Sequence, residues 1–323
     1  MPFNPEGLAL SEGYARTMRD EVLPYNAARG RERIVKGDGG RPLYTVCCDA
    51  DAPRGTVLIV HGFTENADKY AEIIYALLVN GLSVVAYDQR GHGRSWRPEG
   101  LEEISLTHVD SFDEYVRDME IVCRQVLADM PKPHRVLCHS MGGAVTALYL
   151  EAHPGEFDRV AMCAPMIAPN LNGIPRPAAL LMCQTEKKLG HSKRRIVGSK
   201  PYAGERFEDA AANGRERFEW YEALRKATPA FQNNGPTYGW TLEAIRVTDA
   251  ILAPGAVERI DAKVRLYTAE QDGSVLPGPQ GQFIERVRDG ERITVANTRH
   301  EIYRAPDAVL FPWWRDVLSF LSN

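Results

Sequence analysis

Short apolar runs alternate with longer segments of helical spacing along most of the chain. Several runs are continuous, as in Thr56–Val60 (TVLIV), which is typical of strands buried on both faces. We expect strands at residues 31–35, 41–49, 56–60, 82–87, 159–164, 264–269 and 292–295, another ending at 136–137, and helices at 70–80, 112–130, 141–150, 279–288 and 306–321. Strands that alternate with helices of this length predict an α/β fold with a mostly parallel, doubly wound sheet.

Two segments depart from this alternation. Residues 1–30 are predicted to form an irregular arm with a short helix around residues 14–22. From residue 165 to 253 the chain carries proline-rich turns and helical pieces, the latter at residues 178–188, 216–228 and 241–251. We interpret this insertion as a helical cap over the carboxyl ends of the strands, where ligands of open α/β sheets bind. The predicted core is then residues 1–164 together with 254–323.

Composition narrows the class of protein without deciding its function. The 323 residues are 44% hydrophobic and 25% charged, which is ordinary for a globular protein, and the net charge of −4 gives no reason to expect nucleic acid as a partner. The six cysteines lack metal-ligand spacing and favour buried, reduced thiols. The first residues lack the pattern of a secretory signal, and no apolar run approaches the ~18 residues of a membrane span. We therefore expect a cytoplasmic protein, with attachment to a membrane surface left open.

Ser140 stands between a predicted strand and a predicted helix, in Cys138-His139-Ser140-Met141-Gly142. A serine at such a sharp turn is typical of a nucleophile elbow, whose usual pattern is G-x-S-x-G. Gly142 fits this pattern, whereas Cys138 is larger than glycine but still small. The N-terminus of the following helix also favours a developing negative charge. The alternative is that Ser140 is an ordinary helix N-cap.

A serine hydroxyl needs a histidine base that a carboxylate holds in one tautomer. Where the serine lies on an elbow of this kind, the acid and then the histidine follow it in the chain, each at the carboxyl end of a later strand. Asp272 and His300 lie just beyond two predicted strands and have this order. His191 lies in the inserted cap, so we favour His300. Glu270 is the alternative acid, but its position relative to the strand end favours Asp272.

Two backbone N–H groups are needed to hold the negative oxygen of the reaction intermediate. We expect one from Met141, which follows the serine, and the other from Phe63, in the loop after the first buried parallel strand. His61 precedes the elbow and is interpreted as structural. Arg90 and His92 are interpreted as residues that brace a loop. In the cap, residues 187–195 (KKLGHSKRR) form a basic run that is either a solvated face or a contact for anionic lipid headgroups.

Several motifs together carry a family resemblance. They are His61-Gly62 with Glu65 and Tyr70, Asp88–Ser95 (DQRGHGRS), 139–143 (HSMGG) and His300-Glu301, supported by 108–116 (HVDSFDEYV), 164–166 (APM), 235–240 (GPTYGW) and Ala269-Glu270. In these motifs the chain resembles the monoglyceride lipase and lysophospholipase branch of the α/β-hydrolases, most of all the bacterial inner-membrane-associated lysophospholipases. The resemblance covers roughly residues 30–320.

The resemblance implies an α/β-hydrolase fold with an inserted cap and neither a metal nor an organic cofactor. It also implies a catalytic triad of Ser140, Asp272 and His300, with Phe63 and Met141 as the oxyanion donors. The chain departs from the family pattern at two places. Cys138 replaces the first glycine of the elbow, and the acid loop at residues 272–274 (DGS) differs from that of the lysophospholipases.

We expect a serine hydrolase that cleaves carboxylic esters of single-acyl lipids, either lysophospholipids or monoacylglycerols, through an acyl-enzyme. Contact between the cap and the inner face of a membrane is compatible with this function. The alternatives keep the triad and change the substrate: a carboxylesterase for small soluble esters, or a prolyl-type aminopeptidase, for which Glu205, Glu208 and Asp209 in the cap are candidate ligands of the substrate amine. A further alternative is a non-catalytic receptor for a small molecule. The sequence does not indicate an oligomeric state.

Overall fold

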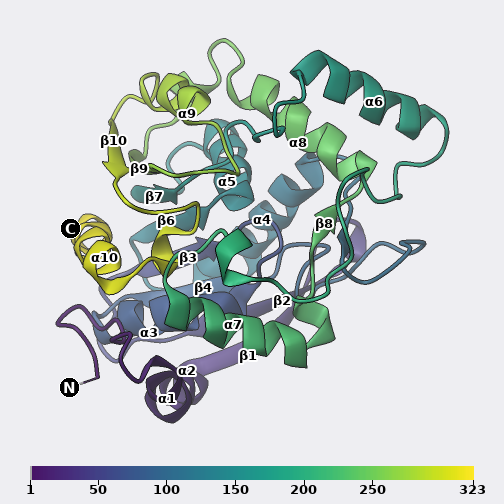
Figure 1. The fold of residues 1–323 in the computed structure, drawn as a ribbon. Coiled ribbons are helices and arrows are strands. Elements are labelled where there is room, and N and C mark those ends of the chain that lie inside the picture. Colours follow the sequence, from purple (N-terminus) through teal and green to yellow (C-terminus); the bar gives the residue numbers. More distant parts are fainter. Residues whose placement is uncertain (1) are drawn as a thin grey trace.

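The predicted strands form one eight-stranded sheet in the computed structural model, which describes residues 2–323 (Figure 1). The strand order is β1-β2-β4-β3-β6-β7-β9-β10. Only β2 runs antiparallel to its neighbours, so the sheet is mostly parallel, as the sequence predicts. The strands are β1 (Gly30–Lys36), β2 (Pro42–Cys48), β3 (Thr56–Val60), β4 (Ser83–Tyr87), β6 (His134–His139), β7 (Arg159–Cys163), β9 (Lys263–Ala269) and β10 (Gly290–Val295).

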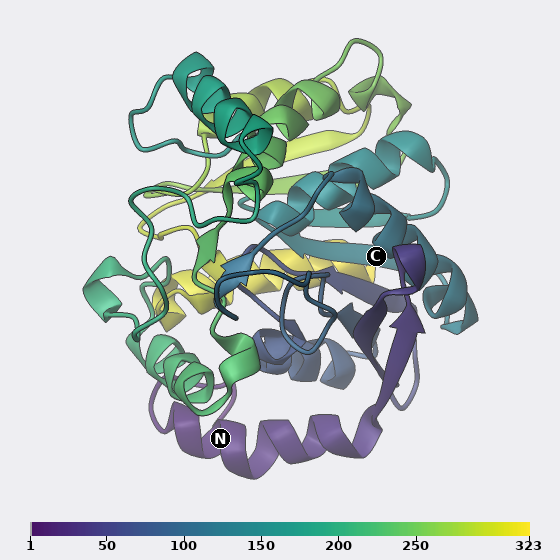
Figure 2. The same ribbon diagram turned by 90° about the vertical axis from the view of Figure 1, so that its right-hand side faces the viewer.

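Helices cover both faces of this sheet (Figures 1 and 2). Apart from those of the N-terminal arm and the inserted segment, the α-helices are α3 (Ala71–Val79), α4 (Asp113–Gln125), α5 (Met141–Ala152), α9 (Pro277–Ile284) and α10 (Asp307–Ser322). Alternate residues of β3 enter opposite halves of the core: Leu58 packs in the half that includes α4 and α5, and Ile59 in the half that includes α3 and α10. Burial on both faces explains why this strand is apolar throughout.

The N-terminal arm is more helical than its sequence predicts. It forms α1 (Tyr14–Thr17), a π-helical turn (Met18–Val22) and α2 (Leu23–Arg29) without interruption. Tyr14, Met18 and Val22 recur at intervals of four and are buried together against α3, which stabilises a helix longer than the short one expected. Pro24 is the second residue of α2, directly after the π-helical turn.

The segment between β7 and β9 contains three helices: α6 (Arg176–Lys188), α7 (Arg215–Ala227) and α8 (Tyr238–Ile251). Helix α8 packs on α5 and α6, whereas α7 lies against the N-terminal helix α1, and α6 projects at the edge of the molecule (Figure 1). A second, two-stranded sheet joins this segment to the rest of the chain, because β8 (Gly235–Pro236) pairs with β5 (Leu106–Thr107). Within residues 2–323, no helix combines the length and the apolar character that crossing a bilayer requires.

Candidate active site

Ser140 stands at a strained turn between β6 and α5. Its φ of 49° and ψ of −118° lie in a region that residues other than glycine rarely adopt. The two glycines that follow make this turn possible: a Cβ on Gly142 would overlap the Val60 carbonyl oxygen, and one on Gly143 would overlap Pro165. Cys138 is buried in the core on the strand side of the turn, where its side chain has room. The local geometry is therefore that of a nucleophile elbow, in spite of the cysteine.

The structure brings His300 and Asp272 together. His300 Nδ1 lies 2.7 Å from Asp272 Oδ2, while Asp272 Oδ1 accepts hydrogen bonds from the N–H groups of Ser274 (2.8 Å) and Val275 (3.0 Å). Burial alone would raise the pKa of Asp272, but His300 and the two N–H groups lower it below its usual value. Glu270, the alternative acid, is exposed and accepts a hydrogen bond from the Asn297 N–H instead.

Ser140 is nearly buried and lies against the loop after β3. A Cβ on Gly62 would come within 3.0 Å of Ser140 Cβ, so the serine and this loop are neighbours. Within residues 2–323, Ser140 Oγ and His300 Nε2 form no hydrogen bond. Catalytic hydrogen bonds are often long in free enzymes and tighten when substrate binds. The arrangement leaves His300 Nε2 as the nitrogen that can take a proton, because Nδ1 faces Asp272.

The two expected oxyanion donors, the N–H groups of Phe63 and Met141, have no acceptor among the described residues. Met141 is the first residue of α5, where backbone N–H groups lack helical partners. The Phe63 ring is held between Trp240 of α8, 4.1 Å away between ring centroids, and His92, 5.9 Å away. Phe63 is thus the point where the inserted segment touches the loop beside Ser140.

His61, Arg90 and His92 have structural partners. His61 Nδ1 lies 2.7 Å from the Gly62 carbonyl oxygen and its Nε2 accepts the Gln89 N–H, and burial lowers its pKa to about 4. His61 is therefore neutral, with the proton on Nδ1. Arg90 pairs with Asp118 of α4 at 2.6 Å, and His92 Nδ1 lies 3.0 Å from the Arg90 carbonyl oxygen. These contacts brace the loops, as the sequence predicts.

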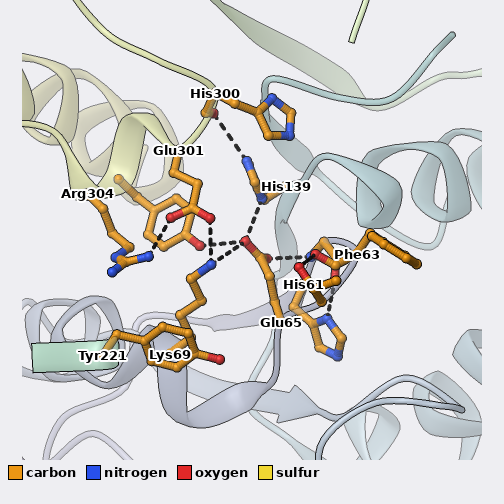
Figure 3. Close-up of polar contacts among 12 residues, drawn as sticks. His61, Phe63, Glu65, Lys69, His139, Tyr221, His300, Glu301 and Arg304 are labelled. Carbon is orange, nitrogen blue, oxygen red and sulfur yellow. Dashed lines mark hydrogen bonds and ion pairs between the residues drawn. The ribbon is translucent and has the colours of Figure 1, made fainter. Parts of the chain in front are cut away.

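A buried network of charged side chains lies beside the site (Figure 3). Its members are Glu65, Lys69, His139, Glu301 and Arg304. Lys69 Nζ lies 3.1 Å from Glu65 Oε1 and 2.6 Å from Glu301 Oε1, and Arg304 pairs with Glu301 at 2.6 Å. Sequence patterns missed these roles, apart from the presence of Glu65, His139 and Glu301 in the family motifs. The only signal was that charged residues stand next to candidate site residues.

The acids of the inserted segment that could bind a substrate amine are already paired. Glu205 Oε2 lies 2.8 Å from Arg225 Nη1, and Glu208 and Asp209 are exposed beside Arg206. Some cations of the basic run at residues 187–195 also have partners among the described residues, and others do not. Lys193 and Arg195 bind the loop at residues 99–105, whereas Lys188 and Arg194 remain exposed.

The largest of the described cavities is remote from the candidate triad. It has a volume of about 620 Å³ and lies between α2, β2, α3 and α7, with no residue of the triad in its wall. A cavity of about 320 Å³ lies closer to the acid loop, where Pro169 bridges to Val275. Its wall is mostly apolar and includes Leu171, Ile174, Ile245 and Leu276. We consider the cavity of about 320 Å³ as part of the candidate site because it adjoins the acid loop. No cluster of metal-ligating side chains was found within residues 2–323.

Comparisons with known proteins agree with the fold and the motifs. Residues 51–307 match the Hydrolase_4 family (serine aminopeptidase, S33). Lysophospholipase L2 of Escherichia coli is 30% identical over 276 residues, which are 83% of this chain and 80% of that protein. Human monoglyceride lipase is 32% identical over 151 residues, which are 46% of each chain.

Solved structures show the same fold at lower identity. The monoacylglycerol lipase of Paleococcus ferrophilus has a TM-score of 0.67 at 21% identity and covers 87% of this chain and 98% of its own. A soluble variant of the Saccharomyces cerevisiae monoglyceride lipase has a TM-score of 0.71 at 19% identity, covering 90% and 95%. The chain therefore belongs to the Hydrolase_4 family of serine hydrolases with the α/β-hydrolase fold, in the branch that contains lysophospholipase L2 and the monoglyceride lipases.

Proposed function

We propose that this protein hydrolyses carboxylic esters of single-acyl lipids, lysophospholipids or monoacylglycerols, through an acyl-enzyme on Ser140. The hydrogen bond between His300 and Asp272, together with the strained turn that carries Ser140, is the observation that carries the chemistry. The names of two relatives, lysophospholipase L2 and monoglyceride lipase, support the substrate class. No metal or organic cofactor takes part in the proposed reaction.

The first half of the reaction forms the acyl-enzyme. Ser140 Oγ attacks the ester carbonyl carbon while its proton passes to His300 Nε2, and Asp272 keeps the other nitrogen of the ring protonated and stabilises the cation. The carbonyl oxygen becomes negative and accepts hydrogen bonds from the N–H groups of Phe63 and Met141. The bond to the alcohol then breaks, and His300 gives its proton to the leaving oxygen.

The second half releases the fatty acid. Water takes the place of the alcohol and gives a proton to His300 Nε2 as its oxygen attacks the acyl carbon. The tetrahedral intermediate uses the same two N–H groups. When it collapses, the bond to Ser140 Oγ breaks, and the proton on His300 returns to the serine. Each turnover therefore consumes one water molecule and restores the free triad.

We assign residues 165–253 the role of a cap that selects the substrate. The apolar cavity of about 320 Å³ beside the acid loop is the proposed place for the acyl chain. Its wall comes from the start of the inserted segment, from α8 and from the loop after β9. Leu181 of α6 is 66% exposed and contributes no wall to this cavity.

Two rival substrates keep the same triad. An aminopeptidase would need an acidic group free to bind the substrate amine, and the pairing of Glu205 with Arg225 disfavours this role. The family description nevertheless names a serine aminopeptidase, so an amide substrate belongs in any test. A small soluble ester is the other alternative substrate, because it can react with the triad without filling the proposed acyl site. A non-catalytic receptor differs from all of these, since its serine would not react with a fluorophosphonate.

We also propose that the projecting end of α6 contacts a membrane surface. Leu181 in the middle of α6 and Leu189 directly after it are 66% and 62% exposed, and Lys188 and Arg194, in and after the last turn of the helix, are exposed cations. Apolar side chains surrounded by lysine and arginine favour the surface of an anionic bilayer. Such a contact would place the cap next to a store of single-acyl lipids.

Hydrolysis rates across a matched panel test the proposed substrate class. The panel contains lysophosphatidylcholine, lysophosphatidylethanolamine, monoacylglycerol, p-nitrophenyl esters from two to sixteen carbons and a prolyl amide. We expect the highest kcat/KM on the long single-chain lipids. A preference for short esters or for the prolyl amide, with the lipids inert, would contradict the substrate class and leave the triad in place.

A further inference from the structure

Glu65 is a buried carboxylate whose contacts reach three parts of the proposed site: the loop of Phe63, the turn of Ser140 and the loop that follows His300 (Figure 3). Its side chain is 1% exposed, and it lies in the loop between β3 and α3. We propose that Glu65 is a positioning residue for the reaction, which holds the oxyanion loop, the serine turn and the histidine loop in fixed relation. This inference rests on the proposed function, because it concerns the geometry of the same reaction.

The first contact is with the oxyanion loop. Glu65 Oε2 accepts a hydrogen bond of 2.5 Å from the Gly62 N–H, one residue before the expected donor Phe63. The same loop is pressed against Ser140, since a Cβ on Gly62 would lie within 3.0 Å of both Ser140 Cβ and Glu65 Oε2. A small rotation of this loop would therefore turn the Phe63 N–H away from the oxygen that it is proposed to stabilise.

The second contact is with the serine turn. Glu65 Oε1 lies 3.0 Å from His139 Nδ1, and His139 is the residue before Ser140. On its other side, His139 Nε2 lies 3.2 Å from the backbone carbonyl oxygen of His300. Burial alone would lower the pKa of His139, but Glu65 raises it above its usual value. His139 therefore lies between Glu65 and the His300 backbone, which links the serine turn to the loop of the candidate base.

The third contact is with the loop that follows His300. Glu65 Oε1 accepts a hydrogen bond of 2.6 Å from the Tyr303 hydroxyl. Lys69 adds an indirect link, because its ammonium group lies between Glu65 and Glu301, the residue after His300. The backbone on the carboxyl side of His300 is thus held at two points, which limits how far its imidazole can move from Ser140.

An ionised carboxylate suits this position for a chemical reason. The hydrogen-bond partners of Glu65 are all donors, namely a backbone N–H, two tyrosine hydroxyls and an ammonium group, and a ring nitrogen of His139 lies 3.0 Å away. A carboxylate offers only acceptor sites to such donors, whereas the amide of a glutamine would turn an NH₂ group towards some of them. The Glu65→Gln substitution therefore keeps the shape of the side chain and removes part of its hold on the three loops.

Glu72 provides a matched control. It is also buried, with 5% exposure, and it accepts hydrogen bonds from Arg217, the Tyr14 hydroxyl and the Ala9 N–H. These contacts join α3 to α7 and to the N-terminal arm, and none of them involves a loop of the site. Glu72→Gln thus disturbs a similar buried network without touching the proposed chemistry.

The experiment compares kcat and KM of the wild type, Glu65→Gln and Glu72→Gln on one soluble p-nitrophenyl ester. Assays are made at a temperature where thermal melts show each variant to be folded. Misplacement of reacting groups by about 1 Å can cost about 100-fold in rate. We expect kcat of Glu65→Gln to fall about 100-fold with little change in KM, and the rate of fluorophosphonate labelling to fall in parallel. Glu72→Gln should melt earlier but keep kcat within threefold of the wild type.

A folded Glu65→Gln variant with wild-type kcat would overturn the inference, as would an equal loss of kcat in Glu72→Gln. If Glu65→Gln fails to fold, Tyr303→Phe and Tyr14→Phe replace the pair, since each removes one hydroxyl bound to the respective carboxylate. Only Tyr303→Phe should lower kcat. Failure of the proposed function is distinguishable: without the serine mechanism the wild type would neither cleave the ester nor react with the fluorophosphonate, and a wrong substrate class would appear only in the lipid panel.

Discussion

The loops at the carboxyl ends of the central strands and the inserted segment are held in different ways. In the loops around Ser140, His61 and Glu65, side chains are almost fully buried, and His61 and Glu65 bind residues on distant parts of the chain. In the inserted segment, α6 projects from the molecule and Leu181 is exposed (Figure 1). Many charged side chains there, such as Arg206 and Glu208, contact only other residues at the surface. The proposed chemistry therefore lies in the more rigidly held region.

This difference separates catalysis from selection of the substrate. Reacting groups must be placed within fractions of an ångström, and buried networks provide such placement. A surface that recognises long lipid chains tolerates movement, because contacts between apolar groups are not directional. Substitutions in the loops should thus affect every substrate alike, whereas substitutions in the inserted segment should affect particular substrates or the membrane.

The largest effect is expected from the candidate base and its partner. His300→Ala and Asp272→Asn should each lower kcat by about 10⁴-fold or more on both a soluble ester and a lipid, because the serine then lacks a correctly oriented base. Steady-state rates on the two substrates measure this. A loss of activity on only one of the two substrates, in either variant, would contradict the separation of catalysis from substrate selection.

The buried network should also make stability depend on pH. Lys69 and Arg304 lower the pKa of Glu301 from its ordinary value to about 2, although burial alone would raise it. The stabilising effect of this carboxylate is therefore complete above about pH 4.5 and is lost as the pH falls towards 2, up to about 3 kcal/mol. Urea unfolding should show a large difference in free energy between wild type and Glu301→Gln at pH 7 and a smaller one at pH 3.

The exposed Glu208 of the inserted segment is the control for this measurement, since its pair with Arg206 is open to solvent. Exposed pairs contribute little to stability. Glu208→Gln should leave the free energy of unfolding unchanged at both pH values. A difference for Glu301→Gln that stayed constant with pH would show that its ionisation does not stabilise the fold.

An intermediate effect is expected where the two regions meet. Trp240 of α8 packs on Phe63, so Trp240→Ala should loosen a proposed oxyanion donor and lower kcat about tenfold on all esters, less than the roughly 10²–10³ that removal of such a donor costs. Trp220 of α7 packs edge-on against Tyr14, far from the site, and Trp220→Ala is the control. Equal kcat losses in the two variants, measured on folded protein, would argue against a special role for the contact with Phe63.

The smallest effect on catalysis is expected from the projecting helix. Replacing Lys188 and Arg194 together by glutamine removes two exposed cations, each of which contributes about 1 kcal/mol of binding near an anionic surface. Sedimentation with anionic vesicles should show about tenfold or greater weakening of binding, with no change in hydrolysis of p-nitrophenyl acetate. Unchanged vesicle binding would refute the proposed membrane contact.

The sequence was informative where local patterns decide the structure. Continuous apolar runs such as Thr56–Val60 predict central strands because burial on both faces leaves no polar position. The turn at Ser140 is also predictable from the sequence. Gly142 and Gly143 mark it, because the close approach of Val60 to the first and of Pro165 to the second leaves no room for a Cβ. His300 and Asp272 follow from their positions beyond strand ends, and the structure places their side chains 2.7 Å apart.

The features that the sequence did not reveal depend on residues far apart in the chain. Glu65 binds Tyr303 across 238 residues, and Lys69 binds Glu301 across 232. No local pattern marks such partners. The pairing of β5 with β8 was missed because strands of two residues carry no periodicity. The length of the N-terminal helix depends on burial of Tyr14, Met18 and Val22 against α3, which the arm alone does not show.

The central claim is that Ser140 is a nucleophile activated by His300. Its most direct test is to treat the folded protein with a fluorophosphonate and to locate the adduct by peptide mass spectrometry, in the wild type and in His300→Ala. We predict a single adduct on Ser140 in the wild type and labelling slower by several orders of magnitude in the variant. An adduct on another residue, or equal labelling of Ser140 in the two proteins, would contradict this account.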